Sequence, residues 1–222
     1  MGRFREWNHF SDGGQAVILG AVFISAVPEG AATGAVADYY RQQTAAWGFL
    51  PYYAMAFSTR PDVAQAWNVL NTAVRDGMDR RRFEIATIAA SRALRSTYCT
   101  TAHSKFLRDA CGYEQTPTLI AADPSGATLD DQDRAVYQFA DKIAADASSV
   151  TQADVDELRA AGLSDSDVAD VVFAAAARSF FTRVLDGLGA QLDHQTGAAF
   201  PSELLRTMIV GRPPSSAGAV DS

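Results

Sequence analysis

The stretch that decides the fold runs from Glu84 to His103 and reads EIATIAASRALRSTYCTTAH. Its first half is rich in alanine and isoleucine, a composition that favours a helix with a largely buried surface. Ser96 is a residue type that caps helix starts, so a second helix is expected to begin there or at Thr97. Gly112 is expected to end that second helix, because glycine favours the C-terminal cap. An antiparallel hairpin of the two helices would bring Glu84 alongside the segment that holds His103.

Helical patterns extend outward from this hairpin, and the long alternation typical of β-strands is missing. Proline at first helical positions, acidic first turns and closing glycines mark the helix ends. The ranges predicted to be helical are residues 33–47, 61–76, 80–95, 97–111, a short helix from 116, 130–147, 152–161 and 165–189. We therefore expect an all-α fold, a helical bundle built from helix hairpins. It would form one domain over residues 21–210, between an N-terminal extension, 1–20, and a flexible tail, 211–222.

Length, charge and cysteine count exclude several classes of protein. A chain of 222 residues that is 48% hydrophobic can bury a core, and two cysteines cannot make a disulfide-dense secreted scaffold. The net charge of −7 argues against nucleic acid or an anionic membrane as a partner. The longest apolar stretch, residues 16–27, is shorter than the roughly 20 residues that span a membrane. It has the length of a signal-peptide core but no clean cleavage site follows it, so we expect a cytoplasmic protein.

Four residues around the hairpin can carry chemistry together. Cys99 and His103 are four positions apart, so a helix places them on one face. Cys99 follows Ser96 by three positions, in the first turn, where free amide groups and the helix dipole favour a thiolate. His103 can carry protons to and from the thiol, and Ser96 can donate a hydrogen bond to the thiolate. Glu84 can orient the imidazole or accept a proton.

The same residues have structural alternatives. A buried cysteine is commonly a small hydrophobic residue, and a histidine on a helix is commonly a hydrogen-bonded packing residue. A zinc site made of Glu84, Cys99 and His103 would lack the usual pairs of zinc ligands, so we expect no metal and no cofactor. Cys111 lies about 18 Å from Cys99 along a continuous helix, beyond the reach of a disulfide. We expect Cys111 to be a buried packing thiol.

The spacing of Glu84, Ser96, Cys99 and His103 resembles the pattern Glu-x11-Cys-x-x-Cys-x-x-x-His of alkylhydroperoxidase AhpD-like proteins, in the carboxymuconolactone decarboxylase family. The resemblance extends over about residues 23–193. The further segments that carry it are residues 48–51, 60–62, 82–84, 112, 150–162 and 182–189. It implies an AhpD-like helical bundle that assembles as a homo-oligomer, either a trimer or a hexamer.

The resemblance also implies a role for each residue of the pattern. Glu84 would be the active-site carboxylate, Cys99 the peroxide-reactive thiol and His103 the relay histidine. Ser96 stands where two-cysteine members have the resolving cysteine, which closes a disulfide onto the oxidised thiol. Serine cannot do this, so an external thiol would be the reductant. Tyr98 stands where some members have histidine; it either keeps a hydroxyl near the site, as an auxiliary group, or packs against the neighbouring helix.

Three functions are open at this point. The leading hypothesis is a thiol-dependent peroxidase-like oxidoreductase, with peroxiredoxin-type antioxidant activity toward an organic hydroperoxide at Cys99. The second is a cofactor-free acid–base enzyme similar to the decarboxylases, in which Glu84 and His103 act on an organic acid or lactone. The third is a non-catalytic oligomer with a vestigial site that binds a partner through the acidic segment 123–170.

Overall fold

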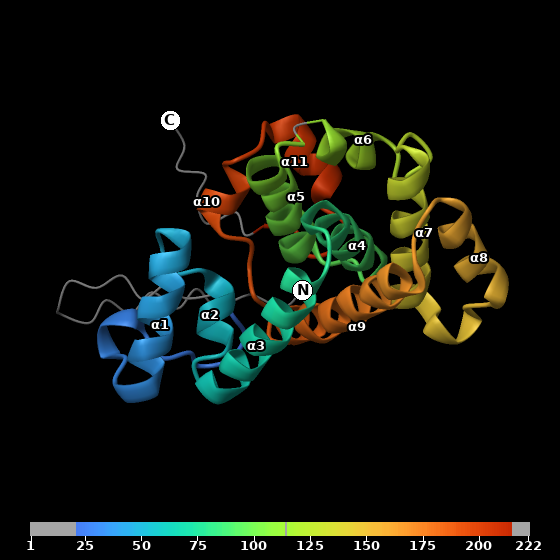
Figure 1. Cartoon of the computed structure of the whole chain (residues 1–222). Coiled ribbons are helices and arrows are strands. Elements are labelled where there is room, and N and C mark those ends of the chain that lie inside the picture. Colours follow the sequence, from blue (N-terminus) through green and yellow to red (C-terminus); the bar gives the residue numbers. More distant parts are fainter. Residues whose placement is uncertain (1–20, 114, 215–222) are drawn as a thin grey trace, which may run out of the picture.

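A computed structural model describes residues 21–113 and 115–214 of the chain (Figure 1). These ranges contain eleven α-helices and no β-strand, so the all-α fold expected from the sequence is confirmed. The N-terminal extension expected over residues 1–20 lies outside the described residues, as does most of the expected tail. The α-helices are α1 (Gly34–Trp47), α2 (Tyr52–Ala56), α3 (Pro61–Gly77), α4 (Arg80–Ala93), α5 (Thr97–Cys111), α6 (Thr116–Ala122), α7 (Asp131–Asp146), α8 (Gln152–Ala160), α9 (Asp165–Gly187), α10 (His194–Gly197) and α11 (Ser202–Met208), and short 3₁₀ turns occupy Glu29–Ala31 and Ala147–Ser149.

The helix ends follow the local signals of the sequence. Asp79 accepts a hydrogen bond from the Arg82 amide and so caps α4. Ser164 caps α9 through a reciprocal capping box with Asp167. Gly112 ends α5 with a φ of 73°, a left-handed conformation that glycine adopts at little cost. The short helices α2, α10 and α11 were not predicted, because each is at most seven residues long and too short to show a helical period.

The turn between α4 and α5 is two residues longer than predicted, because the predicted helices 80–95 and 97–111 leave only residue 96 between them. Helix α4 ends at Ala93, two residues before the expected end. Only residues 94–96 connect it to α5, and Arg95 has a φ of 59°. This left-handed conformation stops the helix and reverses the chain. Ser96 occupies the N-cap position of α5 as expected, but its side chain makes no capping hydrogen bond.

Helix α4 is the centre of the bundle and packs against α5, α7 and α9 (Figure 1). Every residue from Phe83 to Ser91 is buried, so the middle of α4 has no face toward solvent. Ile85 and Ile88 are fully buried in the main hydrophobic cluster. Glu84 lies in the same turn and is also fully buried. A carboxylate takes such a position only when other groups satisfy its charge and hydrogen bonds.

A second hydrophobic cluster fills the space between α1–α3 and the bundle. It includes Tyr40, Phe57, Tyr98, Cys99 and Phe181, which come from four different parts of the chain. Figure 1 shows α1, α2 and α3 gathered on one side of the molecule, with α3 running beside α9. The motif helix α5 therefore contacts both clusters, and its first turn faces the layer formed by α1–α3.

Ion pairs fix the start of α4 to two other helices. Arg81 donates to Asp133 of α7 over 2.8 Å, and Arg82 pairs with Asp167 of α9. These contacts set the position of α4, and with it that of Glu84, at the centre of the bundle. Within the described ranges, no helix combines the length and the apolar character needed to cross a bilayer.

Candidate functional site

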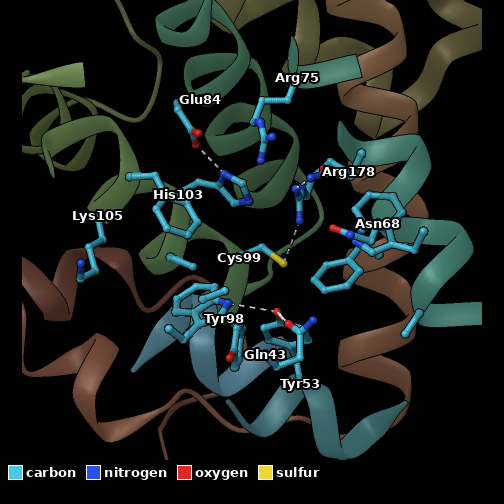
Figure 2. A pocket seen from close by; sticks show the side chains of 18 of the residues that line it. Gln43, Tyr53, Asn68, Arg75, Glu84, Tyr98, Cys99, His103, Lys105 and Arg178 are labelled. Atoms are coloured by element: carbon cyan, nitrogen blue, oxygen red, sulfur yellow. Dashed lines mark hydrogen bonds and ion pairs between the residues drawn. The ribbon is translucent and has the colours of Figure 1, made fainter. Parts of the chain in front are cut away.

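A cavity of about 460 Å³ lies between the layer formed by α1–α3 and helices α4, α5 and α9 (Figure 2). Its size falls within the range of about 300–1,000 Å³ typical of small-molecule sites. Glu84, Tyr98, Cys99 and His103 all line it, together with Arg178. Ser96 does not. The structure thus brings four of the five site residues expected from the sequence around one cavity.

Glu84 and His103 form a buried pair across the hairpin of α4 and α5. Glu84 Oε2 lies 2.6 Å from His103 Nδ1, and Arg80 Nε donates to the other carboxylate oxygen over 2.7 Å. Burial raises the pKa of Glu84, but the neighbouring His103 and Arg80 outweigh burial and hold that pKa below its usual value. Glu84 is therefore ionised at neutral pH and accepts both hydrogen bonds.

The hydrogen bond with Glu84 defines the state of the His103 ring. Burial and the nearby Arg178 guanidinium lower the pKa of His103 to about 4, although Glu84 opposes this shift. The imidazole is neutral at pH 7, and its single N–H must be on Nδ1, because the ionised Glu84 can only accept. Nε2 then carries the lone pair. The pair Glu84–His103 is thereby arranged as a base that can take up a proton at Nε2.

Cys99 lies in the first turn of α5, and its side chain is buried. In Figure 2 its sulfur points toward the guanidinium of Arg178, whose Nη1 is 4.0 Å from Cys99 Sγ. A guanidinium at this distance stabilises negative charge on the sulfur. Two features therefore favour a thiolate at Cys99. Its first-turn position was expected from the sequence, and the neighbouring Arg178 was not.

Arg178 is a candidate site residue that was not predicted from the sequence. It comes from the middle of α9, is only 4% exposed, and donates from Nη2 to Asn71 Oδ1 over 3.3 Å. Its guanidinium carbon lies over the rings of Trp67 and Phe181, 5.5 and 5.3 Å from their centroids. Among the described residues no carboxylate pairs with it. A lone arginine within the apolar run VVFAAAARSFF, residues 171–181, was the available signal.

Ser96 and Tyr98 take structural positions. Ser96 is fully buried, and its hydroxyl has no partner within hydrogen-bond distance. It lies close enough to Asp186 to lower the pKa of that carboxyl group, which burial raises. The ring of Tyr98 lines the cavity, but its hydroxyl donates to Asp193, which also accepts from the Tyr52 amide over 2.7 Å. Tyr98 thus links α5 to the segment that follows α9.

The two cysteines are separate, as the sequence indicated. Both are free thiols: Cys99 is buried at the cavity, and Cys111 is half-buried at the opposite end of α5. Cys111 packs against the main hydrophobic cluster, and burial raises the pKa of its thiol. Helix α5 therefore holds one thiol at the cavity and one away from it.

Comparisons with known proteins agree with this architecture. Residues 61–122, from α3 to α6, match the model of the Carboxymuconolactone decarboxylase family. No curated protein matches the sequence. Among solved structures, the AhpD core of an uncharacterized peroxidase-related protein from Ralstonia eutropha JMP134 is similar at a TM-score of 0.70 and 21% identity, covering 86% of this chain and 98% of that one.

Two further solved structures share the fold. An uncharacterized peroxidase-related protein from Silicibacter sp. TM1040 has a TM-score of 0.66 at 18% identity, covering 85% of this chain and 97% of that one. Debrominase Bmp8, solved as a cysteine-to-alanine variant in complex with 2,3,4-tribromopyrrole, has a TM-score of 0.62 at 18% identity, covering 77% and 89% of the two chains. Residues 61–122 are thus similar to the carboxymuconolactone decarboxylase family model, and the chain has the AhpD-like fold.

Proposed function

We propose that this protein is a thiol-dependent peroxidase-like oxidoreductase that reduces an organic hydroperoxide at Cys99. The observation that carries this proposal is the placement of the Cys99 sulfur in a cavity, 4.0 Å from the Arg178 guanidinium. It lies on the same face of α5 as His103, which pairs with Glu84 of α4. A reactive thiol needs a route for its proton and a cation for its negative charge. Both are present at this cavity.

The first step is the ionisation of Cys99. The thiol proton passes to Nε2 of His103, and the imidazolium that forms is stabilised by the ionised Glu84 at Nδ1. The negative charge left on the sulfur faces Nη1 of Arg178. Because the imidazole is neutral before this step, His103 is ready to act as the base at neutral pH.

The second step breaks the peroxide bond. The thiolate sulfur attacks the terminal oxygen of the hydroperoxide, so that an S–O bond forms and the O–O bond breaks. The electron pair of the O–O bond leaves on the alkoxide, which takes back the proton held by His103 and departs as an alcohol. Cys99 becomes a sulfenic acid: the sulfur has lost two electrons and the peroxide has gained them.

Cys99 must then be reduced from outside the chain. Ser96 cannot form a disulfide, and Cys111 lies at the far end of α5. An external thiol would attack the sulfenic sulfur, release water and leave a mixed disulfide. A second external thiol would attack the outer sulfur of this mixed disulfide. The products would be the Cys99 thiol and a disulfide of the two external thiols. We therefore expect turnover to depend on the concentration of an added thiol.

Trapping of the sulfenic acid tests this proposal directly. The protein is treated with an alkyl hydroperoxide in the presence of dimedone, and the adduct is located by mass spectrometry. We expect an adduct on Cys99, its absence in Cys99→Ser, and an unchanged yield in Cys111→Ser. No adduct on Cys99 of the folded wild-type protein, or equal labelling of the two cysteines, would exclude the proposal.

A second candidate function is an acid–base enzyme acting on an organic acid or lactone. It is favoured by the completeness of the Glu84–His103 pair, which needs no help from Cys99 to take up a proton. The two functions differ in one variant: Cys99→Ser abolishes peroxide reduction but leaves acid–base turnover largely intact. Substitution of His103 by Ala would impair both. A protein inactive in both assays, with ordinary thiol reactivity, would favour a vestigial site.

We also propose that the chain forms a homo-oligomer, either a trimer or a hexamer. The support is an apolar surface on α3 and α9, two helices that pack together. Val69 and Leu70 of α3 are 67% and 49% exposed, and Phe173 and Phe180 of α9 are 56% and 44% exposed. Size-exclusion chromatography with light scattering measures the assembly, and the double variant Leu70→Glu, Phe173→Glu is expected to dissociate it.

A further inference from the structure

The charge of the cavity is opposite to that of the chain. The whole protein carries −7, but the side chains that line the cavity include four cations, Arg75, Arg80, Lys105 and Arg178, and one carboxylate, Glu84. The cations come from α3, α4, α5 and α9, so the positive charge surrounds the cavity rather than following one helix. A concave site of one sign within a protein of the other sign attracts ligands of opposite charge.

Three of the four cations already have carboxylate partners. Arg80 pairs with Glu84 over 2.7 Å, Arg75 with Asp76 over 2.9 Å, and Lys105 with Asp109 over 2.6 Å. Arg178 has no carboxylate partner among the described residues. It is only 4% exposed, and its Nε is buried without any hydrogen-bond partner.

A buried guanidinium without an anion is unfavourable, because the protein interior replaces the water that would solvate it. Arg178 has five N–H donors, of which Nη1 faces Cys99 and Nη2 donates to Asn71. The side chain points into the cavity in Figure 2. A ligand with a negatively charged group would complete the environment of Arg178, because none of the carboxylates in the described ranges pairs with it.

The walls of the cavity indicate what the rest of such a ligand is. Two pairs of aromatic rings line it: Trp47 lies 5.2 Å from Phe106, and Trp67 is stacked on Phe181 with centroids 4.8 Å apart. Flat aromatic walls around a small volume favour a flat aromatic ligand, which gains offset-stacked or edge-to-face contacts with them.

We propose that the cavity binds a small aromatic carboxylate, with the carboxylate held at Arg178 and the ring between the aromatic walls. Combined with the function proposed above, this makes the substrate an aromatic hydroperoxide that carries a carboxylate. The binding part stands without the peroxidase reaction, because it depends on Arg178 and the aromatic walls alone.

Binding of benzoate and of benzamide, measured by isothermal titration calorimetry, tests the binding part. The two molecules have nearly the same shape, and only benzoate is charged. We expect benzoate to bind at least about ten times more tightly than benzamide and to slow the alkylation of Cys99 by iodoacetamide. Arg178→Met is expected to remove the preference, whereas Arg183→Met, an exposed arginine on the same helix, is expected to keep it.

The outcomes of these experiments distinguish the proposed ligand class from the proposed peroxidase function. Equal affinity for benzoate and benzamide in the wild-type protein would overturn the proposal even if Arg178→Met failed to fold. An unchanged preference in a folded Arg178→Met protein would overturn it as well. If benzoate is preferred but dimedone never labels Cys99, the peroxidase function fails and the ligand class stands. If both hold, kcat/KM should be higher for 4-carboxycumene hydroperoxide than for cumene hydroperoxide, and the difference should disappear in Arg178→Met.

Discussion

Replacing Glu84 by glutamine tests the central element of the site with the smallest change of shape. Glutamine has nearly the same volume and keeps an amide oxygen that can accept the Nδ1–H of His103. It lacks the negative charge that stabilises the imidazolium formed when His103 takes the proton of Cys99. Glu84 is fully buried, so water cannot substitute for the lost charge.

The expected loss follows from the geometry of the pair. The Nδ1–Oε2 distance of 2.6 Å indicates a charge-assisted hydrogen bond, and such bonds exceed neutral ones by about 1–1.5 kcal/mol. The charge–charge attraction of an imidazolium about 4 Å from the carboxylate adds up to about 4 kcal/mol at an effective dielectric constant of about 20. We take the transition-state stabilisation lost in Glu84→Gln as about 2–4 kcal/mol. This loss should slow sulfenic acid formation by about 30- to 900-fold.

The rate of dimedone labelling at Cys99 under a fixed excess of cumene hydroperoxide measures this loss at pH 7. Glu157→Gln, at an exposed position of α8, is the control for loss of one negative charge and should react like the wild type. Circular dichroism would confirm that both variants are folded. A rate for Glu84→Gln within about threefold of the wild-type rate would refute the role assigned to the Glu84–His103 pair.

Four further predictions follow from the same structure. The His103 ring should remain neutral and protonated on Nδ1 down to a pH of about 4, measured by ¹⁵N chemical shifts, and a midpoint near 6.5 would contradict the assigned environment. Burial raises the pKa of Asp193 from 3.8 to about 6, so the folded state binds this proton more tightly, and the free energy of unfolding should fall by about 3 kcal/mol as the pH rises through that window. Asp193→Asn should flatten this fall in urea titrations, and an unchanged profile would point to another group. Cys111→Ser should leave the rate of Cys99 alkylation unchanged, whereas a change of more than about threefold would show that the two thiols are coupled. Ile88→Ala, in the fully buried middle of α4, should lower the free energy of unfolding by about 2–5 kcal/mol, and a loss below about 1 kcal/mol would contradict the central place of that helix.

The parts of the structure that could be predicted from the sequence depend on local signals. Asp79 and Gly112 bound their helices where expected, because caps act within one turn of the chain. The proximity of Glu84 and His103 was also predictable, because the two residues lie on adjacent helices of one hairpin. Arg95 was not predictable as a helix stop, because a left-handed arginine depends on the surrounding packing rather than on residue type.

The rest of the site depends on contacts between distant parts of the chain. Arg178 lies 79 residues from Cys99, and helical periodicity does not indicate which helices meet. The hydroxyl of Tyr98 reaches an acceptor 95 residues away, so its sequence position gave no reason to prefer this partner over the cavity. The spacing pattern predicted that the Ser96 hydroxyl lies near the Cys99 thiol, but Ser96 does not line the cavity. The direction of a side chain at an N-cap depends on the residues that pack around it.

The three-residue turn between α4 and α5 fixes how α5 is rotated about its axis relative to α4. Glu84 and His103 are 19 residues apart, and they meet because both helices leave the turn at defined rotations about their axes. One inserted residue after Arg95 would rotate the whole of α5 by about 100°, which would move His103 and Cys99 together off the face that meets Glu84 and Arg178. Most single substitutions in the turn would be tolerated better than any change of its length. The length of the turn thus decides whether Glu84, Cys99 and His103 meet. A chain that uses these residues together can hardly gain or lose a residue between Glu84 and Cys99.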